Sequence, residues 1–272
     1  MNEFFGFGGY EREPEGYFSW QHLTFVSCFM IVMVLAAVLL GKRNRGRDER
    51  AKNRVLIVSA ILIDAFEIFK IIICCVVDPD PMEWTSVLPL YMCSIQLITI
   101  PLAAFSRGRV KEASLDFVFI FGIIGAVMGT YLAGQNYSCY PVLSFGNTVS
   151  AITHSISGFA SLYIVISGME SMKKKNIPIS FAIISVFSVM AYFVNLSEDT
   201  NYMFLMAGDG TPYDIFYNLV GGSKVLYPIT VVVLFFAYIA LFYGVYMLIK
   251  RKVSREENGA PAETAEEATV SA

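Results

Sequence analysis

Two neighbouring stretches near the N-terminus decide the fold. Residues 23–41 read LTFVSCFMIVMVLAAVLLG, and residues 42–54 read KRNRGRDERAKNR. The first stretch can cross a bilayer as a helix, because about 20 apolar residues rising 1.5 Å each span the hydrocarbon core. The second is dense in Lys and Arg, which accumulate in cytoplasmic loops. Together they predict a membrane-spanning helix that runs from the outside toward the cytoplasm.

The rest of the chain repeats this alternation. Of its 272 residues, 56% are hydrophobic and 16% are charged, whereas a soluble domain carries roughly 25% charged residues. Each apolar run must be helical, because hydrocarbon offers no water to backbone amides. We therefore predict an all-α membrane protein, a bundle of about seven transmembrane helices near residues 22–41, 55–77, 84–105, 115–134, 148–168, 179–196 and 225–249.

The distribution of charge predicts the orientation. Every Lys and Arg falls on one side of the predicted membrane except Arg12, Lys70 and Lys224. By the positive-inside rule, the N-terminus is outside and the C-terminus is cytoplasmic. The expected location is the cell (plasma) membrane.

Three segments flank or connect the spans. Residues 1–21 are predicted to be an external N-terminal tail, and residues 22–249 the seven-helix transmembrane domain. Residues 250–272 are rich in Ala, Glu and Thr, a composition that predicts a disordered cytoplasmic tail. The long outer connection 197–224 is expected either to fold back over the outer face, as a lid or re-entrant segment, or to be a mobile surface loop.

Composition also limits the kind of site. Two His and five Cys in so large a chain exclude a disulfide scaffold and a Cys/His zinc cluster. We expect no metal, no cofactor and no nucleic-acid partner; membrane lipid is the expected partner.

Small and polar residues recur at helical spacing in three spans. Gly122, Gly125 and Gly129 form a small-residue stripe, which is typical of close helix packing in lipid. Polar stripes follow in the next two spans: Asn147, Ser150, His154, Ser157 and Ser161, then Ser185, Ser188, Tyr192 and Asn195. Each stripe occupies one helix face, which predicts a polar cavity shared by the two helices. Hydrogen bonding between helices is the alternative.

The second span carries three charges. Asp64, Glu67 and Lys70 lie within one arc of the helix, and Asp or Lys costs roughly 2.5–3.5 kcal/mol at a helix centre. The arc should therefore face the bundle interior. Glu67 and Lys70 can pair, whereas Asp64 needs a partner elsewhere or stays protonated. A purely structural ion pair is the alternative to a functional site.

Several chemically active residues converge in depth. At 1.5 Å per residue, Lys70 lies about 10 Å, Glu67 about 15 Å, Cys93 about 13 Å and His154 about 9 Å below the outer surface, where His22 begins the first span. All of them therefore fall in the outer half of the membrane. The candidate binding residues are His22, Asp64, Glu67, Lys70, Gln96, Asn147 and Asn201.

Cys93 and His154 are the candidate catalytic residues. A thiol attacks as the thiolate, and a nearby imidazole can take its proton, which is the basis of acyl transfer through a thioester. Gln96 lies one turn from Cys93 on the same helix face. The alternative is that Cys93 is a small buried hydrophobe, as isolated cysteines usually are.

Several tracts resemble the YwaF family of bacterial multi-pass membrane proteins. They are residues 19–22 (SWQH), residues 88–94 (LPLYMCS), the Gly-rich fourth span, His154, and residues 201–205 (NYMFL). That family is distantly similar to a vertebrate transmembrane phospholipid acyltransferase, thought to use a membrane cysteine assisted by a histidine. The resemblance implies that Cys93 matches this cysteine and His154 this histidine.

Two functions therefore compete. The first is a Cys/His lipid acyltransferase acting in the outer half of the bilayer. The second is a transporter or solute-binding membrane protein that uses the Asp64/Glu67/Lys70 arc, although seven spans do not divide into inverted repeats. A retinal-binding sensor is excluded, because residues 225–249 contain no Lys.

Overall fold

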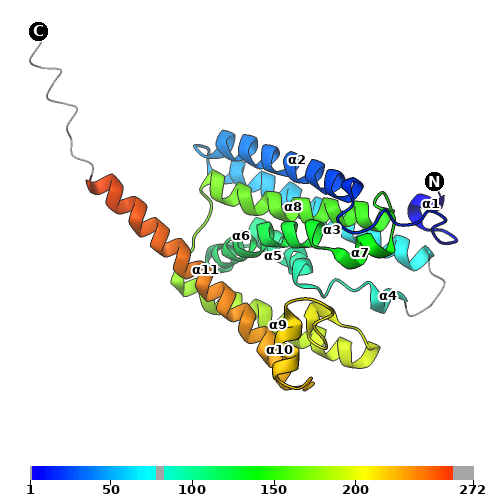
Figure 1. The fold of residues 1–272 in the computed structure, drawn as a ribbon. Helices are drawn as coiled ribbons and strands as arrows, with labels where there is room; N and C mark the ends of the chain where they lie inside the picture. The colour runs from blue at the N-terminus through cyan, green and yellow to red at the C-terminus, as the bar shows by residue number, and fades with distance from the viewer. Residues whose placement is uncertain (1, 78–82, 260–272) are drawn as a thin grey trace, which may run out of the picture.

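The computed structural model describes residues 2–77 and 83–259, and every regular element within these ranges is a helix (Figure 1). Five helical segments are long and apolar enough to cross a membrane: Trp20–Asn44, Gly108–Cys139, Phe145–Ser167, Lys174–Glu198 and Leu226–Val253. This result confirms the predicted class, a helical membrane bundle.

The two other predicted spans also have counterparts. Helix α3 (Glu49–Val77) has 29 residues but carries the three charges of the second span. The shorter apolar segment Met92–Phe105 consists of the 3-10 turn η1 (Met92–Ile95) and helix α5 (Gln96–Phe105). The total of seven spans and the outside position of the N-terminus stay predictions.

Five helices form what we call the main bundle. They are α2 (Trp20–Asn44), α3, α5, α6 (Gly108–Tyr131) and α8 (Phe145–Ser167). Helix α8 is central, because it packs against α2, α3 and α6, while α5 packs against α3 and α6 (Figure 1). Two short helices, α1 (Asn2–Phe5) and α7 (Gly134–Cys139), lie at one end of this bundle.

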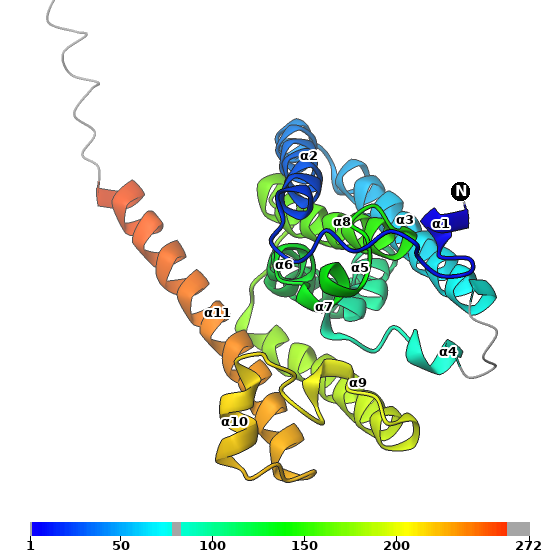
Figure 2. The ribbon, with the colours of Figure 1, turned by 45° about the vertical axis from the view of Figure 1, so that its right-hand side comes forward.

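A second set, the lateral group, lies beside the main bundle. It contains α9 (Ile177–Glu198), α10 (Tyr213–Leu219) and α11 (Leu226–Gly259), and α9 contacts α6 (Figure 2). Helix α11 continues to Gly259, so residues 250–259 are helical where we expected a disordered tail. An uninterrupted apolar helix can extend past the membrane without a stop signal such as Pro. The rest of that tail lies outside the described residues.

Glycines bring α6 and α8 together, as the small-residue stripe predicted. A Cβ atom at Gly122 would lie 2.7 Å from the Ser157 carbonyl oxygen of α8. A Cβ atom at Gly129 would lie 2.0 Å from the imidazole of His154. Gly125 faces open space instead. The stripe therefore packs through two of its three glycines.

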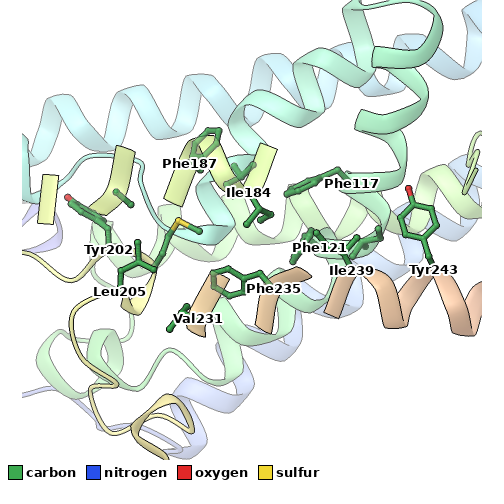
Figure 3. Packing of buried hydrophobic residues seen from close by; sticks show 14 of the residues in the cluster. Phe117, Phe121, Ile184, Phe187, Tyr202, Leu205, Val231, Phe235, Ile239 and Tyr243 are labelled. Atoms are coloured by element: carbon green, nitrogen blue, oxygen red, sulfur yellow. The ribbon is translucent and has the colours of Figure 1, made fainter. Parts of the chain in front are cut away.

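Aromatic and branched side chains fill the space between α6 and the lateral group (Figure 3). The cluster includes Phe117 and Phe121 of α6, Phe187 of α9 and Phe235 of α11. The outer connection joins it, since Tyr202 in the short turn η3 (Tyr202–Phe204) is only 1% exposed. Of the two expectations for residues 197–224, the folded connection is the one observed.

The prediction that the two polar stripes share a polar cavity is wrong. The stripe of α8 faces α6, where Ser161 donates a hydrogen bond to the carbonyl of Phe119 (2.9 Å). The stripe of α9 faces the outer connection, where the Asn195 amide donates to the Tyr202 carbonyl (3.0 Å). Ser161 and Asn195 therefore bond to neighbouring segments, because the fold places α6 between the two stripes. The Ser157 hydroxyl has no hydrogen-bond partner among the described residues.

The third predicted span, 84–105, is not one continuous helix. Helix α4 (Glu83–Ser86) is followed by non-helical residues up to Tyr91, which is extended (φ −76°, ψ 160°). Pro89 contributes to the break, because a residue that precedes proline avoids helical dihedral angles. The depth of about 13 Å assigned to Cys93 assumed an unbroken rise of 1.5 Å per residue, and that derivation no longer holds.

Candidate functional site

Cys93 lies where the extended segment turns into helix. It is the second residue of η1, which leads directly into α5. The amide N–H groups in the first turn of a helix have no partner within the helix. Such a helix start favours negative charge, and cysteines there tend toward the reactive thiolate. The break at Pro89 therefore places the thiol at a helix N-terminus within the apolar region.

His154 approaches this thiol from α8. The Cys93 and His154 side chains lie within reach of each other. The Nδ1 atom of His154 lies 2.8 Å from the Ser150 carbonyl oxygen, which can only accept, so Nδ1 carries the ring proton. Nε2 is then the ring nitrogen that can accept a proton from the thiol. The missing side chain of Gly129 makes the room for the ring.

A charge pair on α3 completes the polar group. The Lys70 ammonium lies 2.5 Å from the Glu67 carboxylate, which is the pairing that their spacing predicted. Glu67 is buried, whereas the Lys70 side chain is 27% exposed. Both charges lie close enough to act on the Cys93 thiol. Asp64 stands apart, half-buried and without a hydrogen bond or ion pair to any described residue.

Gln96 is the buried amide next to the thiol. Its side chain is 1% exposed, and its Oε1 atom accepts a hydrogen bond from the Thr99 hydroxyl (3.0 Å). Its Nε2 atom is buried and has no hydrogen-bond partner among the described residues. A buried donor without a partner is uncommon and requires an explanation.

Three predicted binding residues are fully occupied by their own chain. The buried ring of His22 accepts from the Phe18 N–H (3.2 Å) and donates to the Thr130 carbonyl (3.0 Å). Asn147 donates to the carbonyl of Pro141 (3.0 Å). Asn201 donates to the carbonyl of Ala207 and accepts from two backbone N–H groups of the same loop. These bonds hold all three side chains within the fold, away from the Cys93–His154 contact, and their roles in binding stay predictions.

Sequence reasoning missed the clamp that holds the segment before Cys93. The Tyr202 hydroxyl donates to the Thr85 carbonyl (2.7 Å), and its ring packs edge-on against Tyr91 at 4.9 Å between centroids. Residues 88–94 and 201–205, two of the tracts that carry the family resemblance, therefore meet in space. The resemblance of both tracts to one family was the available sign in the sequence that they could belong to one site.

A groove of about 510 Å³ opens on another face of the main bundle. It lies between α2, α3 and α8 and is lined mainly by apolar side chains, with Arg54, Ser59 and Ser155 among them. At about 100° per residue, the α8 residues that line the groove lie on the side of the helix away from His154, so the groove and the Cys93–His154 contact occupy opposite faces of α8. A groove of this composition suits a lipid acyl chain.

Comparison with known proteins gives one match. The model of the TMEM164 family, a family of multi-pass membrane proteins, matches residues 17–246. No curated protein and no solved structure matches the chain. The matched range contains all the candidate site residues.

Proposed function

We propose that this chain, which belongs to the TMEM164 family of multi-pass membrane proteins, is a lipid acyltransferase that uses Cys93 as nucleophile and His154 as base. The observation that carries the proposal is the close approach of these two side chains. A nucleophile within hydrogen-bonding reach of a base, itself oriented by a third group, is the arrangement of covalent catalysis. Here the Ser150 carbonyl orients the base.

The reaction has two halves. In the first, His154 takes the thiol proton and the sulfur attacks an ester carbonyl; the ester C–O bond breaks, and the leaving alkoxide takes the proton from His154. In the second, His154 takes the proton of an acceptor hydroxyl, whose oxygen attacks the thioester and releases the thiolate; the thiolate then takes the proton back from His154. The Glu67–Lys70 pair has no net charge, so it does not hold a counter-ion beside the Cys93 sulfur. Its two charged groups can still orient polar groups of the substrate there.

Two further observations support a lipid substrate. The thiol lies in an apolar segment, and several tracts resemble the YwaF family. Through that family, the likeness extends to a vertebrate phospholipid acyltransferase. We further propose that the reaction occurs in the outer half of the cell membrane, with the N-terminus outside.

Trapping of the acyl-enzyme tests the proposal. The full-length protein in phosphatidylcholine vesicles, treated with the p-nitrophenyl ester of a long-chain fatty acid, should release p-nitrophenolate and become acylated at Cys93. Cys93→Ser should give no thioester, and His154→Asn should slow acylation strongly; mass spectrometry of the intact chain measures both. A wild-type protein that carries no acyl group on Cys93 refutes the activity.

The orientation is tested independently. A reporter fused to the C-terminus should be cytoplasmic, and one inserted between α7 and α8 should be external. The motivation is the distribution of Lys and Arg. A cytoplasmic signal from the second reporter would reverse the assignment of the site to the outer half.

Solute transport is the second candidate, and Asp64 is the observation in its favour. A half-buried carboxyl group on a membrane helix, with no partner among the described residues, is typical of ion or proton pathways. Uptake of protons or cations into sealed vesicles that depends on Asp64 and not on Cys93 would favour this function over acyl transfer.

A further inference from the structure

We propose that the side-chain amide of Gln96 binds the carbonyl oxygen of the acyl group and stabilises the oxyanion that forms when Cys93 attacks it. This inference rests on the proposed acyltransferase function. It starts from one feature of the structure: the Nε2 atom of Gln96 is buried and has no hydrogen-bond partner among the described residues.

An unused donor at this place is costly. Leaving a buried donor unpaired destabilises the fold, and a Leu of similar size would avoid that cost. The neighbours Ile95 and Ile100 are themselves fully buried and apolar. The rest of the Gln96 amide is held in place, because its Oε1 lies 3.0 Å from the Thr99 hydroxyl one turn further along α5, whose one proton is shared with the Ile95 carbonyl at 3.1 Å. A fixed amide with a free N–H is what a preorganised oxyanion donor requires.

The position along the chain brings this donor to the reacting atoms. Gln96 follows Cys93 by three residues across the junction of η1 and α5, so the two side chains share a helix face. The carbonyl carbon becomes bonded to the Cys93 sulfur, so its oxygen forms next to the first turn of this helix. The backbone N–H groups of Ser94 and Gln96 are already bonded to the carbonyls of Tyr91 and Cys93. The side-chain N–H of Gln96 is therefore a donor that remains available in this turn.

The chemical step is balanced without any further reactant. When the sulfur–carbon bond forms, the electron pair of the C=O π bond moves to oxygen, and the new negative charge is bound by the Gln96 N–H. When the pair returns, the bond to the leaving alkoxide breaks and the alkoxide takes the proton from His154. The amide of Gln96 keeps its own protons throughout. The same donor serves both halves of the reaction, since each passes through a tetrahedral oxyanion.

Two reactions of the same thiol separate this role from a structural one. Alkylation of Cys93 by iodoacetamide needs the thiolate but creates no oxyanion, whereas acylation by the p-nitrophenyl ester of a long-chain fatty acid creates one. The full-length protein in phosphatidylcholine vesicles is used for both. The variants are Gln96→Leu, which removes the amide, and Gln96→Glu, which keeps an acceptor for Thr99 and removes the donor.

We expect both variants to acylate roughly 100- to 1,000-fold more slowly, the usual effect of losing one oxyanion donor, while alkylation of Cys93 is unchanged. Equal loss of both reactions would show that Gln96 only supports the thiol or the fold, and would overturn the inference. Unchanged acylation in Gln96→Glu would also overturn it. If the wild-type protein alkylates but never acylates, the acyltransferase function itself fails and the role of Gln96 falls with it.

Discussion

Helices in the main bundle meet through glycine, whereas helices in the lateral group meet through aromatic rings. A Cβ atom at Gly158 of α8 would lie 2.7 Å from the Cβ of Ala126 in α6. In the lateral group, Phe181 of α9 stacks on Phe236 of α11 with ring centroids 4.3 Å apart. The comparison shows that the two regions support the site differently. Close backbone contact in the main bundle positions polar side chains such as His154, and the large side chains of the lateral group pack against that bundle from outside.

The candidate site lies on the border between the two regions. Ile95, two residues after Cys93 in η1, packs in the aromatic cluster of the lateral group, whereas Ile100 of α5 packs in the core of the main bundle. The thiol is thus carried by a segment that both regions hold. Sites need this kind of support, because a reacting group that moves by about 1 Å loses much of its effect.

Replacing Asp116 should have the largest effect, because this residue links the two regions. The buried carboxylate on α6 accepts from the N–H groups of Ser171 and Met172, from the Asn176 amide and from the Tyr243 hydroxyl of α11. Asp116→Ala leaves these donors unpaired and should lower the free energy of unfolding by about 3–5 kcal/mol. Unfolding in detergent micelles measures it.

The matched control is Tyr243→Phe, which removes one of these donors and should cost only about 1 kcal/mol. If Asp116→Ala lowers the free energy of unfolding no more than this control does, the carboxylate does not join the main bundle to the lateral group.

Gly129→Ala should damage the site next most strongly. The added methyl group would lie 2.0 Å from the His154 imidazole, so the ring or the helix must move. Overpacking of this kind costs about 1–3 kcal/mol, and we expect acylation of Cys93 to be lost. Gly125→Ala is the control, since a Cβ there meets nothing within 4 Å. Equal acylation in the two variants would contradict the assignment of close packing to the site.

Apolar run length and polar periodicity were enough to predict much of this molecule. The bilayer fixes the length of a span, so α8 and α9 were located to within a few residues. The steps of three and four residues around His154 identified the face that it occupies. The expectation that Cys93 and His154 would be neighbours also used a depth for Cys93 that was derived from a helix that is broken, so that part of the reasoning does not explain their contact.

The periodicity of polar residues along a helix does not predict which neighbouring helix the polar face contacts. The stripe of α8 meets α6, and the stripe of α9 meets Tyr202, because the order of helices in space depends on long-range packing. The break before Cys93 was equally hidden. A Pro within an apolar run is compatible with a kinked helix or with an unwound segment, and here the Tyr202 clamp on Thr85 and Tyr91 accompanies the unwound form.

The Glu67–Lys70 pair offers a smaller test on the main bundle. Lys70→Leu leaves the buried Glu67 carboxylate without its partner. Loss of one partner of a fully buried pair costs 3–5 kcal/mol. Because the Lys70 side chain is 27% exposed, we expect about 1–3 kcal/mol here. Adding Glu67→Gln to Lys70→Leu should recover part of the loss in thermal unfolding. Strictly additive losses would mean that the two side chains do not interact.

Tyr202→Phe should have the smallest effect on stability and a selective effect on the site. It removes the hydrogen bond to the Thr85 carbonyl, 2.7 Å in length, and keeps the ring on Tyr91. The cost in unfolding free energy should be about 1 kcal/mol. Because the clamp holds the segment that leads into Cys93, acylation of Cys93 should slow as well, while the lateral group remains folded.

Tyr192→Phe is the matched control for this last experiment. Its hydroxyl also donates to a backbone carbonyl, that of Lys224 at 3.1 Å, but in an exposed part of the lateral group. It should cost less stability than Tyr202→Phe, because the lost bond is exposed to solvent, and it should leave acylation unchanged. A slower rate in Tyr202→Phe alone would mean that the lateral group positions the thiol through this one bond. Equal acylation rates in the two variants would mean that the lateral group does not position the Cys93 thiol.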